Sequence, residues 1–169
     1  MNDRLFFADS IGVQASTDGL DFDHFYRSEA DKLSRALTLS LGDRDLADEA
    51  VDEAMARAFQ RWRKIGSYES PSGWVYRVAF NWATNSRRNR RREVLTTDWV
   101  ETEVSDDFDP DLQRALDQLS VEARSVVVLR YLLGWSTADT AKALGIRSGT
   151  VKSRLARALE RLEVLLGER

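Results

Sequence analysis

Apolar residues recur at three- and four-residue steps along most of this 169-residue chain. That period places them on one face of a helix, whereas a half-buried strand would need strict alternation of apolar and polar residues. The sequence shows no competing alternation and no internal repeat. Only two prolines and nine glycines are present, so long helices are possible. The pattern predicts an all-α protein.

Three helices are expected in the first half, after a flexible arm over residues 1–20. The first runs from Phe22 and is closed by Gly42, and the third runs from Pro71 into an arginine-rich end at 87–92. Asp43 or Asp45 is the expected N-cap of the second helix, residues 64–70 are expected to be a loop, and Ser70 precedes a proline in the first turn of the third helix.

Residues 93–113 carry eight acidic side chains and no basic one, whereas the segments before and after carry net charges of +1 and +4. The stretch 93–111 contains Pro110 and has no sustained period, so it is interpreted as a linker. Four shorter helices are expected after it. Their expected bounds are 110–118, 120–133, 136–144 and 148–166, with N-caps at Ser120 and Ser136. The prediction is two small helical domains joined by an acidic linker.

Composition excludes several kinds of chemistry. The chain has no cysteine, which removes disulfides, thiolate metal sites and cysteine nucleophiles. Its single histidine, His24, is expected to be an ordinary, partly exposed residue. No apolar window is long enough for a membrane span, and the N-terminus lacks the basic start and apolar stretch of a signal peptide. We expect a cytoplasmic protein with no membrane segment, cofactor, metal or catalytic site, and therefore not an enzyme.

Residues 136–155 read STADTAKALGIRSGTVKSRL and have the pattern of a helix-turn-helix. A short helix ends at Gly145, and a second helix carries an apolar stripe that begins at Val151. A helical wheel turns Thr150, Ser153 and Arg157 away from that stripe. Hydroxyls and cations on such a face suit the major groove. The alternative is a basic helical hairpin whose charged residues are only solvated.

The third helix predicts a second nucleic-acid surface. Its expected buried side includes Trp74, Val78 and Trp82, and its opposite side carries two aromatic residues among polar and cationic ones: Tyr76, Arg77, Phe80 and Thr84. Aromatic rings beside cations suit stacking on unpaired bases, and the five arginines between 87 and 92 extend the positive charge. The alternative is that Tyr76 and Phe80 pack against the loop or another domain.

The second helix has a face of opposite sign, made of Asp48, Glu49, Asp52 and Glu53. Such a face repels DNA and suits a protein partner with a basic surface, although a solvated face is an equally simple interpretation.

Three segments resemble extracytoplasmic-function sigma factors of bacterial RNA polymerase. The first, DRDLADEAVDEAMARAFQRW at 43–62, resembles their polymerase-clamp helix. The second, SPSGWVYRVAFNWATNSRRNRRR at 70–92, resembles their −10 segment. The third, at 116–162, resembles their −35 domain very closely and reads LDQLSVEARSVVVLRYLLGWSTADTAKALGIRSGTVKSRLARALERL.

The resemblance implies an alternative sigma factor that recognises a promoter, melts it and starts transcription. Residues 21–92 would be sigma region 2 and residues 112–169 sigma region 4. The implied partners are promoter DNA, core RNA polymerase through the clamp of its β′ subunit and its β flap, and an anti-sigma factor. The loop 66–72 and Asn81 would hold a flipped base. The implied contacts are Asp48, Glu49, Asp52 and Glu53 with polymerase; Tyr76, Arg77, Phe80, Asn81, Thr84, Arg87 and Arg88 with the −10 element; and Arg147, Ser148, Thr150, Lys152, Ser153, Arg154 and Arg157 with the −35 element.

The chain departs from the family pattern at three positions. Asp52 stands where Gln is common, Phe80 where Arg is common, and Arg147 where a Ser or Thr caps the recognition helix. Either Ser148 caps one residue later or Arg147 contacts phosphate.

Three other functions would use parts of the same pattern. A repressor or response-regulator output domain would bind a palindrome without polymerase, but the sequence has no evident dimer helix and no alternating β and α elements. A protein-only adaptor would not need the arginine run, and a nucleic-acid enzyme would need a convergent carboxylate or metal cluster.

Overall fold

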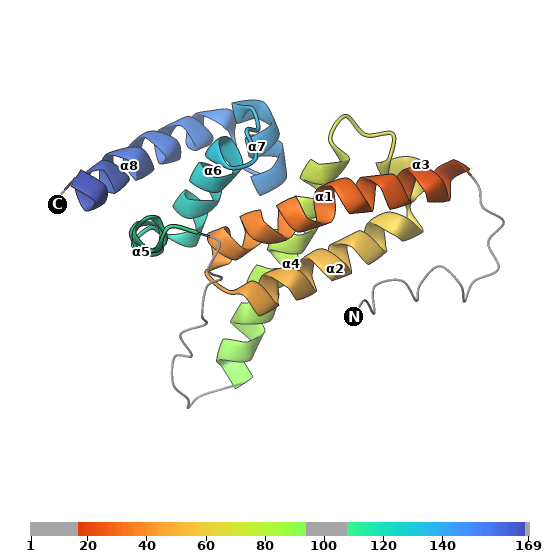
Figure 1. The fold of residues 1–169 in the computed structure, drawn as a ribbon, viewed down its shortest axis with the longest axis horizontal. Coiled ribbons are helices and arrows are strands. Elements are labelled where there is room, and N and C mark those ends of the chain that lie inside the picture. The colour runs from red at the N-terminus through yellow and green to blue at the C-terminus, as the bar shows by residue number, and fades with distance from the viewer. Residues whose placement is uncertain (1–16, 94–107, 168–169) are drawn as a thin grey trace.

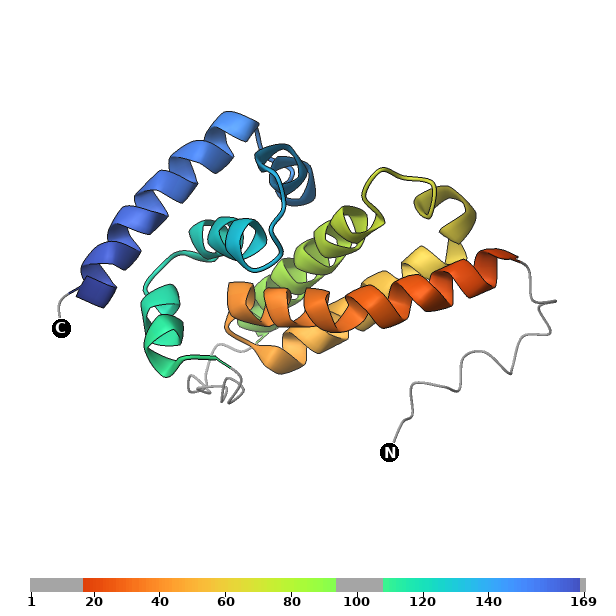
Figure 2. The same ribbon diagram turned by 45° about the horizontal axis from the view of Figure 1, so that its top comes forward.

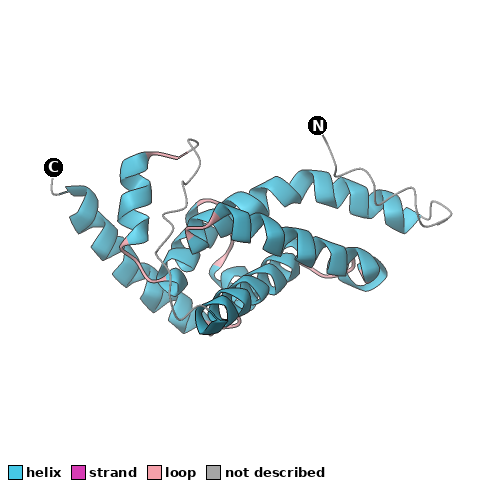
Figure 3. Cartoon of the chain, turned by 90° about the horizontal axis from the view of Figure 1, so that it is seen from below, coloured by secondary structure: helices cyan, strands magenta, loops and turns pink. Residues whose placement is uncertain are grey.

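The computed structural model describes residues 17–93 and 108–167. Most of the expected arm at 1–20 and most of the acidic linker at 93–111 lie outside the described residues. Within the described ranges every regular element is a helix (Figure 3), which confirms the all-α prediction. None of these helices has the length and apolar character needed to cross a membrane.

The first half contains α1 (Thr17–Leu41), α2 (Arg44–Gln60), the single turn α3 (Trp62–Ile65) and α4 (Pro71–Glu93) (Figure 1). Asp43 caps α2 by accepting a hydrogen bond from the Leu46 amide, as predicted. Gly42 ends α1 with φ +68°, a conformation that a Cβ disfavours. The turn α3 lies partly in the segment that we expected to be a loop.

The second half contains α5 (Pro110–Asp117), α6 (Val121–Tyr131), α7 (Thr137–Leu144) and α8 (Ser148–Gly167). Ser120 and Ser136 are N-caps, as predicted. The Ser136 hydroxyl accepts from the Asp139 amide and donates to the Asp139 carboxylate at 2.6 Å. In a capping box the side chain three residues on accepts from the backbone amide of the capping residue, whereas here the Asp139 carboxylate accepts from the Ser136 hydroxyl.

The two halves pack against each other (Figure 2). α6 lies along the C-terminal part of α1, and α7 lies beside α4. One continuous apolar core joins Leu37 and Tyr76 of the first half to Leu129 and Ala143 of the second. A smaller cluster of Val126, Ala141 and Val151 holds the helix-turn-helix together. The position of α4, with α1 and α2 on one side and α7 on the other, decides which of its residues are accessible.

Candidate nucleic-acid and polymerase interfaces

The outward face of α8 lies as the helical wheel predicts. Val151 and Ala158 are buried beneath it, because they pack on α6 and α7. The side chains of Lys152, Ser153 and Arg157 are exposed. Of the remaining residues expected on this surface, Arg147 and Ser148 are exposed, and Thr150 and Arg154 are partly exposed. The structure therefore brings all seven residues to one accessible helix and the turn before it.

The start of α8 excludes one of the two alternatives raised by Arg147, that Ser148 caps the helix. The carbonyl of Arg147 accepts from the amides of Thr150 and Val151, at 2.9 and 3.1 Å. Arg147 is thus the residue before the helix, and Ser148 is its first residue rather than its cap. Gly145 makes the turn with φ +65°, as expected for a left-handed helix end.

Tyr76 does not face solvent, which contradicts the expected exposed aromatic surface on α4. Its side chain is 1% exposed. The hydroxyl lies 2.9 Å from that of Ser40 on α1, and the Ser125 hydroxyl of α6 is near enough to affect its pKa. The ring packs edge-on against Trp135, with the centroids 5.9 Å apart. Burial raises the pKa of Tyr76 to about 12, with the two serine hydroxyls opposing that shift.

Phe80 and Thr84 follow Tyr76 on the same side of α4 and are partly exposed. The Phe80 ring is partly buried and stacks on Tyr76 with centroids 6.0 Å apart. The Thr84 hydroxyl donates to the Phe80 carbonyl at 2.9 Å. For Tyr76 the alternative in which it packs against another domain therefore describes this structure, whereas Phe80 is only partly buried beside it. The helical wheel predicted a single buried side for α4. That prediction is wrong because α4 packs against both halves of the chain, on two different sides.

The arginines of α4 differ in their surroundings. Arg87 donates to the Leu41 carbonyl at 2.9 Å and lies 4.0 Å from an Asp43 carboxylate oxygen. Burial lowers its pKa, opposed by the charge of Asp43. Arg77 and Arg88 remain exposed. A groove of about 470 Å³ lies between the end of α4 and the start of α6, lined by Thr84, Arg87, Arg88, Arg91, Arg92, Val121 and Glu122.

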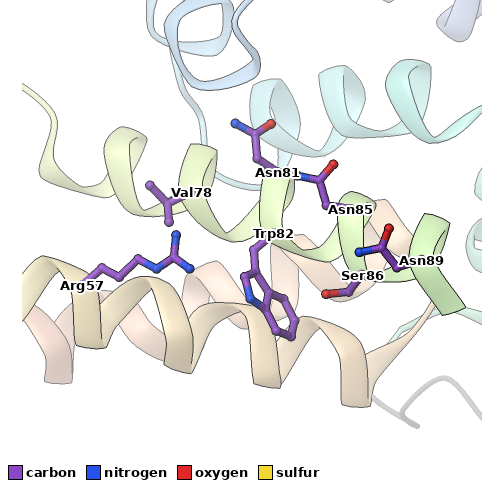
Figure 4. Close-up of a pocket in the computed structure, with 7 residues that line it drawn as sticks. All are labelled: Arg57, Val78, Asn81, Trp82, Asn85, Ser86 and Asn89. Carbon is purple, nitrogen blue, oxygen red and sulfur yellow. The ribbon is translucent and has the colours of Figure 1, made fainter.

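Asn81 lies in a different groove, of about 400 Å³, between α2 and α4 (Figure 4). Asn85 and Asn89 follow it at four-residue steps, so three amides line one side of α4. Trp82 reaches from α4 toward α2, where Arg57 completes the lining. Sequence reasoning missed Asn85, Asn89 and Arg57, although the spacing of the asparagines is visible in the sequence. No residue of the loop 66–72 lines this groove.

The acidic residues of α2 lie on its accessible side and are partly neutralised by neighbouring arginines. Asp52 is exposed, and Glu53 pairs with Arg57 at 2.7 Å. Glu49 pairs with Arg90 of α4 at 3.2 Å. Asp48 is partly buried, accepts a hydrogen bond from Ser34 and lies 3.9 Å from Arg44. Exposed pairs of this kind hold little free energy, so a basic partner can displace them.

The described ranges contain no cluster of three His, Cys, Asp or Glu side chains that is arranged to hold a metal ion.

Comparisons with known proteins agree with this architecture. Residues 25–93 match the family model for Sigma-70 region 2, and residues 110–162 match that for Sigma-70, region 4. The chain is 33% identical over 174 residues to the ECF RNA polymerase sigma factor SigM of Mycobacterium tuberculosis, covering 95% of this chain and 84% of the relative. It is 38% identical over 149 residues to the RNA polymerase sigma-E factor of Streptomyces coelicolor, covering 85% of this chain and 84% of the relative.

Among solved structures, the sigma factor RpoE in complex with the anti-sigma factor NepR from Bartonella quintana matches with a TM-score of 0.72 and 27% identity. The match covers 88% of this chain and 99% of that one. The chain belongs to the Sigma-70 family and is similar to its extracytoplasmic-function members. It is an alternative sigma factor that directs transcription initiation.

Proposed function

We propose that α8 recognises the −35 element of a promoter by entering the major groove. The observation that carries this proposal is the exposed set Lys152, Ser153 and Arg157 above buried Val151 and Ala158. A lysine, a hydroxyl and an arginine supply donors and an acceptor for base edges, and the nearby Arg154 supplies a cation for phosphate.

The −10 element is the expected ligand of α4, with Asn81 in the base-binding role. The groove supports this role because Asn81, Asn85 and Asn89 present amides that both donate and accept hydrogen bonds. The arginines that line the neighbouring groove supply positive charge for the phosphate backbone. Tyr76 is buried and Phe80 is partly buried in this structure, so they contribute to this surface only if the two halves of the chain are arranged differently.

The acidic face of α2 is proposed to dock on the basic surface of the β′ clamp, through Asp48, Glu49, Asp52 and Glu53. Residues 21–92 and 112–169 then act as the two promoter-binding domains, the second also meeting the β flap, with 93–111 as the acidic connection. We expect a cytoplasmic protein without catalytic activity of its own. An anti-sigma factor is the expected regulator, since the solved RpoE structure is a complex with one.

Run-off transcription with purified core polymerase on genomic fragments tests this function. Specific transcripts are expected only when both core polymerase and this chain are present. Binding of a palindromic site by the chain alone, without stimulation of transcription, would favour a repressor instead. Arg157→Ala is expected to change preference at one or two upstream positions by about 1–3 kcal/mol. A uniform loss across promoter variants would mark Arg157 as a phosphate contact.

A further inference from the structure

The groove that holds Asn81 is shared by two helices whose proposed partners differ. One wall belongs to α4, where Asn81, Asn85 and Asn89 follow one another at four-residue steps, and α2 contributes Arg57 from the other side (Figure 4). Arg57 is the only charged side chain among the described residues that line the groove. A DNA strand that meets the amides of α4 therefore lies beside a guanidinium of the helix proposed to dock on polymerase.

The two kinds of side chain in this groove suit two parts of a nucleotide. An asparagine amide donates and accepts hydrogen bonds at base edges but carries no charge for a phosphate, whereas a guanidinium binds phosphate with two parallel donors. Asn81, Asn85 and Arg57 are exposed, so a strand reaches them without any rearrangement of the chain. The eight residues from Asn81 to Asn89 rise about 12 Å, which matches about three stacked nucleotides.

Arg57 already has a partner, and that partner belongs to the proposed polymerase surface. Its Nε and one terminal nitrogen lie 2.8 and 2.7 Å from the same carboxylate oxygen of Glu53. The two side chains are 50% and 41% exposed, so water weakens the pair. Each member of this ion pair thus has a separate proposed ligand of opposite charge: a basic protein surface for Glu53 and a phosphate for Arg57.

We infer that Arg57 binds the promoter's phosphate backbone in the groove between α2 and α4, and that core polymerase releases it for this role by taking over Glu53. The inference rests on the proposed functions of α2 and α4. Neither charge is left unpaired by the exchange, because the clamp replaces Arg57 and the phosphate replaces Glu53. Core polymerase and promoter then favour each other's binding by the same factor, which is about twofold for an exposed pair on one helix.

Arg57→Gln tests the inference, because it removes the charge and keeps a polar side chain of similar reach. Promoter affinity at saturating core polymerase is expected to fall about tenfold, and the slope of its logarithm against the logarithm of salt concentration by about 1. Affinity for core polymerase without DNA, measured by fluorescence anisotropy, is expected to rise by about twofold, because Glu53 is freed for the clamp.

The opposite directions of the two changes separate the possible roles of Arg57. A fall in core affinity that matches the fall in promoter affinity would make Arg57 a docking residue and overturn the inference. An unchanged core affinity would overturn its release by polymerase. Arg57→Lys keeps the charge and should keep the salt slope. A slope lowered as much by lysine as by glutamine would overturn the phosphate contact.

Arg44→Gln is the matched control on the same helix. Arg44 is 56% exposed and lies 3.9 Å from Asp48, another carboxylate of the docking face four residues away, but it lines neither of the two grooves. Its loss should leave promoter affinity and the salt slope unchanged. Equal losses from both variants would reflect overall charge and overturn the assignment to Arg57.

Failure of the inference and failure of the proposed function give different results. If the original chain forms a specific promoter complex with core polymerase and Arg57→Gln does not weaken it, the inference alone is overturned. If the original chain forms no specific promoter complex, the proposed function fails together with the inference.

Discussion

The hydroxyl of Tyr76 is expected to make this protein lose stability at alkaline pH. An unfolded tyrosine releases its proton with a pKa near 10.0, whereas burial raises that of Tyr76 to about 12. Below pH 10 both the folded and unfolded states hold the proton, so the stability due to Tyr76 is fully present. Between pH 10 and about 12 the unfolded state releases its proton first, which favours unfolding. The full difference corresponds to about 3 kcal/mol, and about 1.4 kcal/mol is lost by about pH 11.

Tyr76→Phe is the matched comparison, because every other titrating group stays the same. Neither neighbouring serine is left without a partner: Ser40 still donates to the Ala36 carbonyl and Ser125 to that of Val121. The variant should therefore be less stable by only about 1 kcal/mol at about pH 8. Urea unfolding at a series of pH values should show this gap vanish, or reverse slightly, by about pH 11. A gap that stays constant over that range would refute the burial of Tyr76 between the two halves.

Three further predictions concern the helix ends and the polymerase surface. Gly134→Ala should lower the free energy of unfolding by about 1–2 kcal/mol, because φ is +66° there and nothing lies within 4 Å of an added Cβ. Gly42→Ala should lower it by more, because the added Cβ would lie 3.1 Å from the Arg124 guanidinium. Equal losses in urea unfolding would contradict this contact. Ser136→Ala should lower the free energy of unfolding by about 1 kcal/mol through loss of the α7 cap, and an unchanged midpoint would show that the cap contributes nothing. Reversing Asp52 and Glu53 to Lys should weaken core-polymerase binding in fluorescence anisotropy while circular dichroism stays helical, and unchanged affinity would remove α2 as the docking surface.

The positions of the helices could be read from local signals. Asp43, Ser120 and Ser136 cap helices because a side-chain oxygen meets an amide three residues on, and this needs no distant partner. Gly42 and Gly145 end helices because a left-handed residue is required there. The outward face of α8 followed from its period, since only one side of that helix packs on the protein.

Long-range packing governed the features that the sequence did not reveal. The groove of Asn81 needs Arg57 from another helix, a pairing that no local spacing encodes. The covered side of α4 depends on the second half folding back, which brings Ser125 and Trp135 to a tyrosine 49 or more residues earlier in the chain. The sequence by itself thus determined the helices, their ends and the class of protein, because these follow from contacts within a few residues. Which side of α4 is accessible was decided by tertiary structure alone, because a helix with two packed sides has no single polar face to mark it.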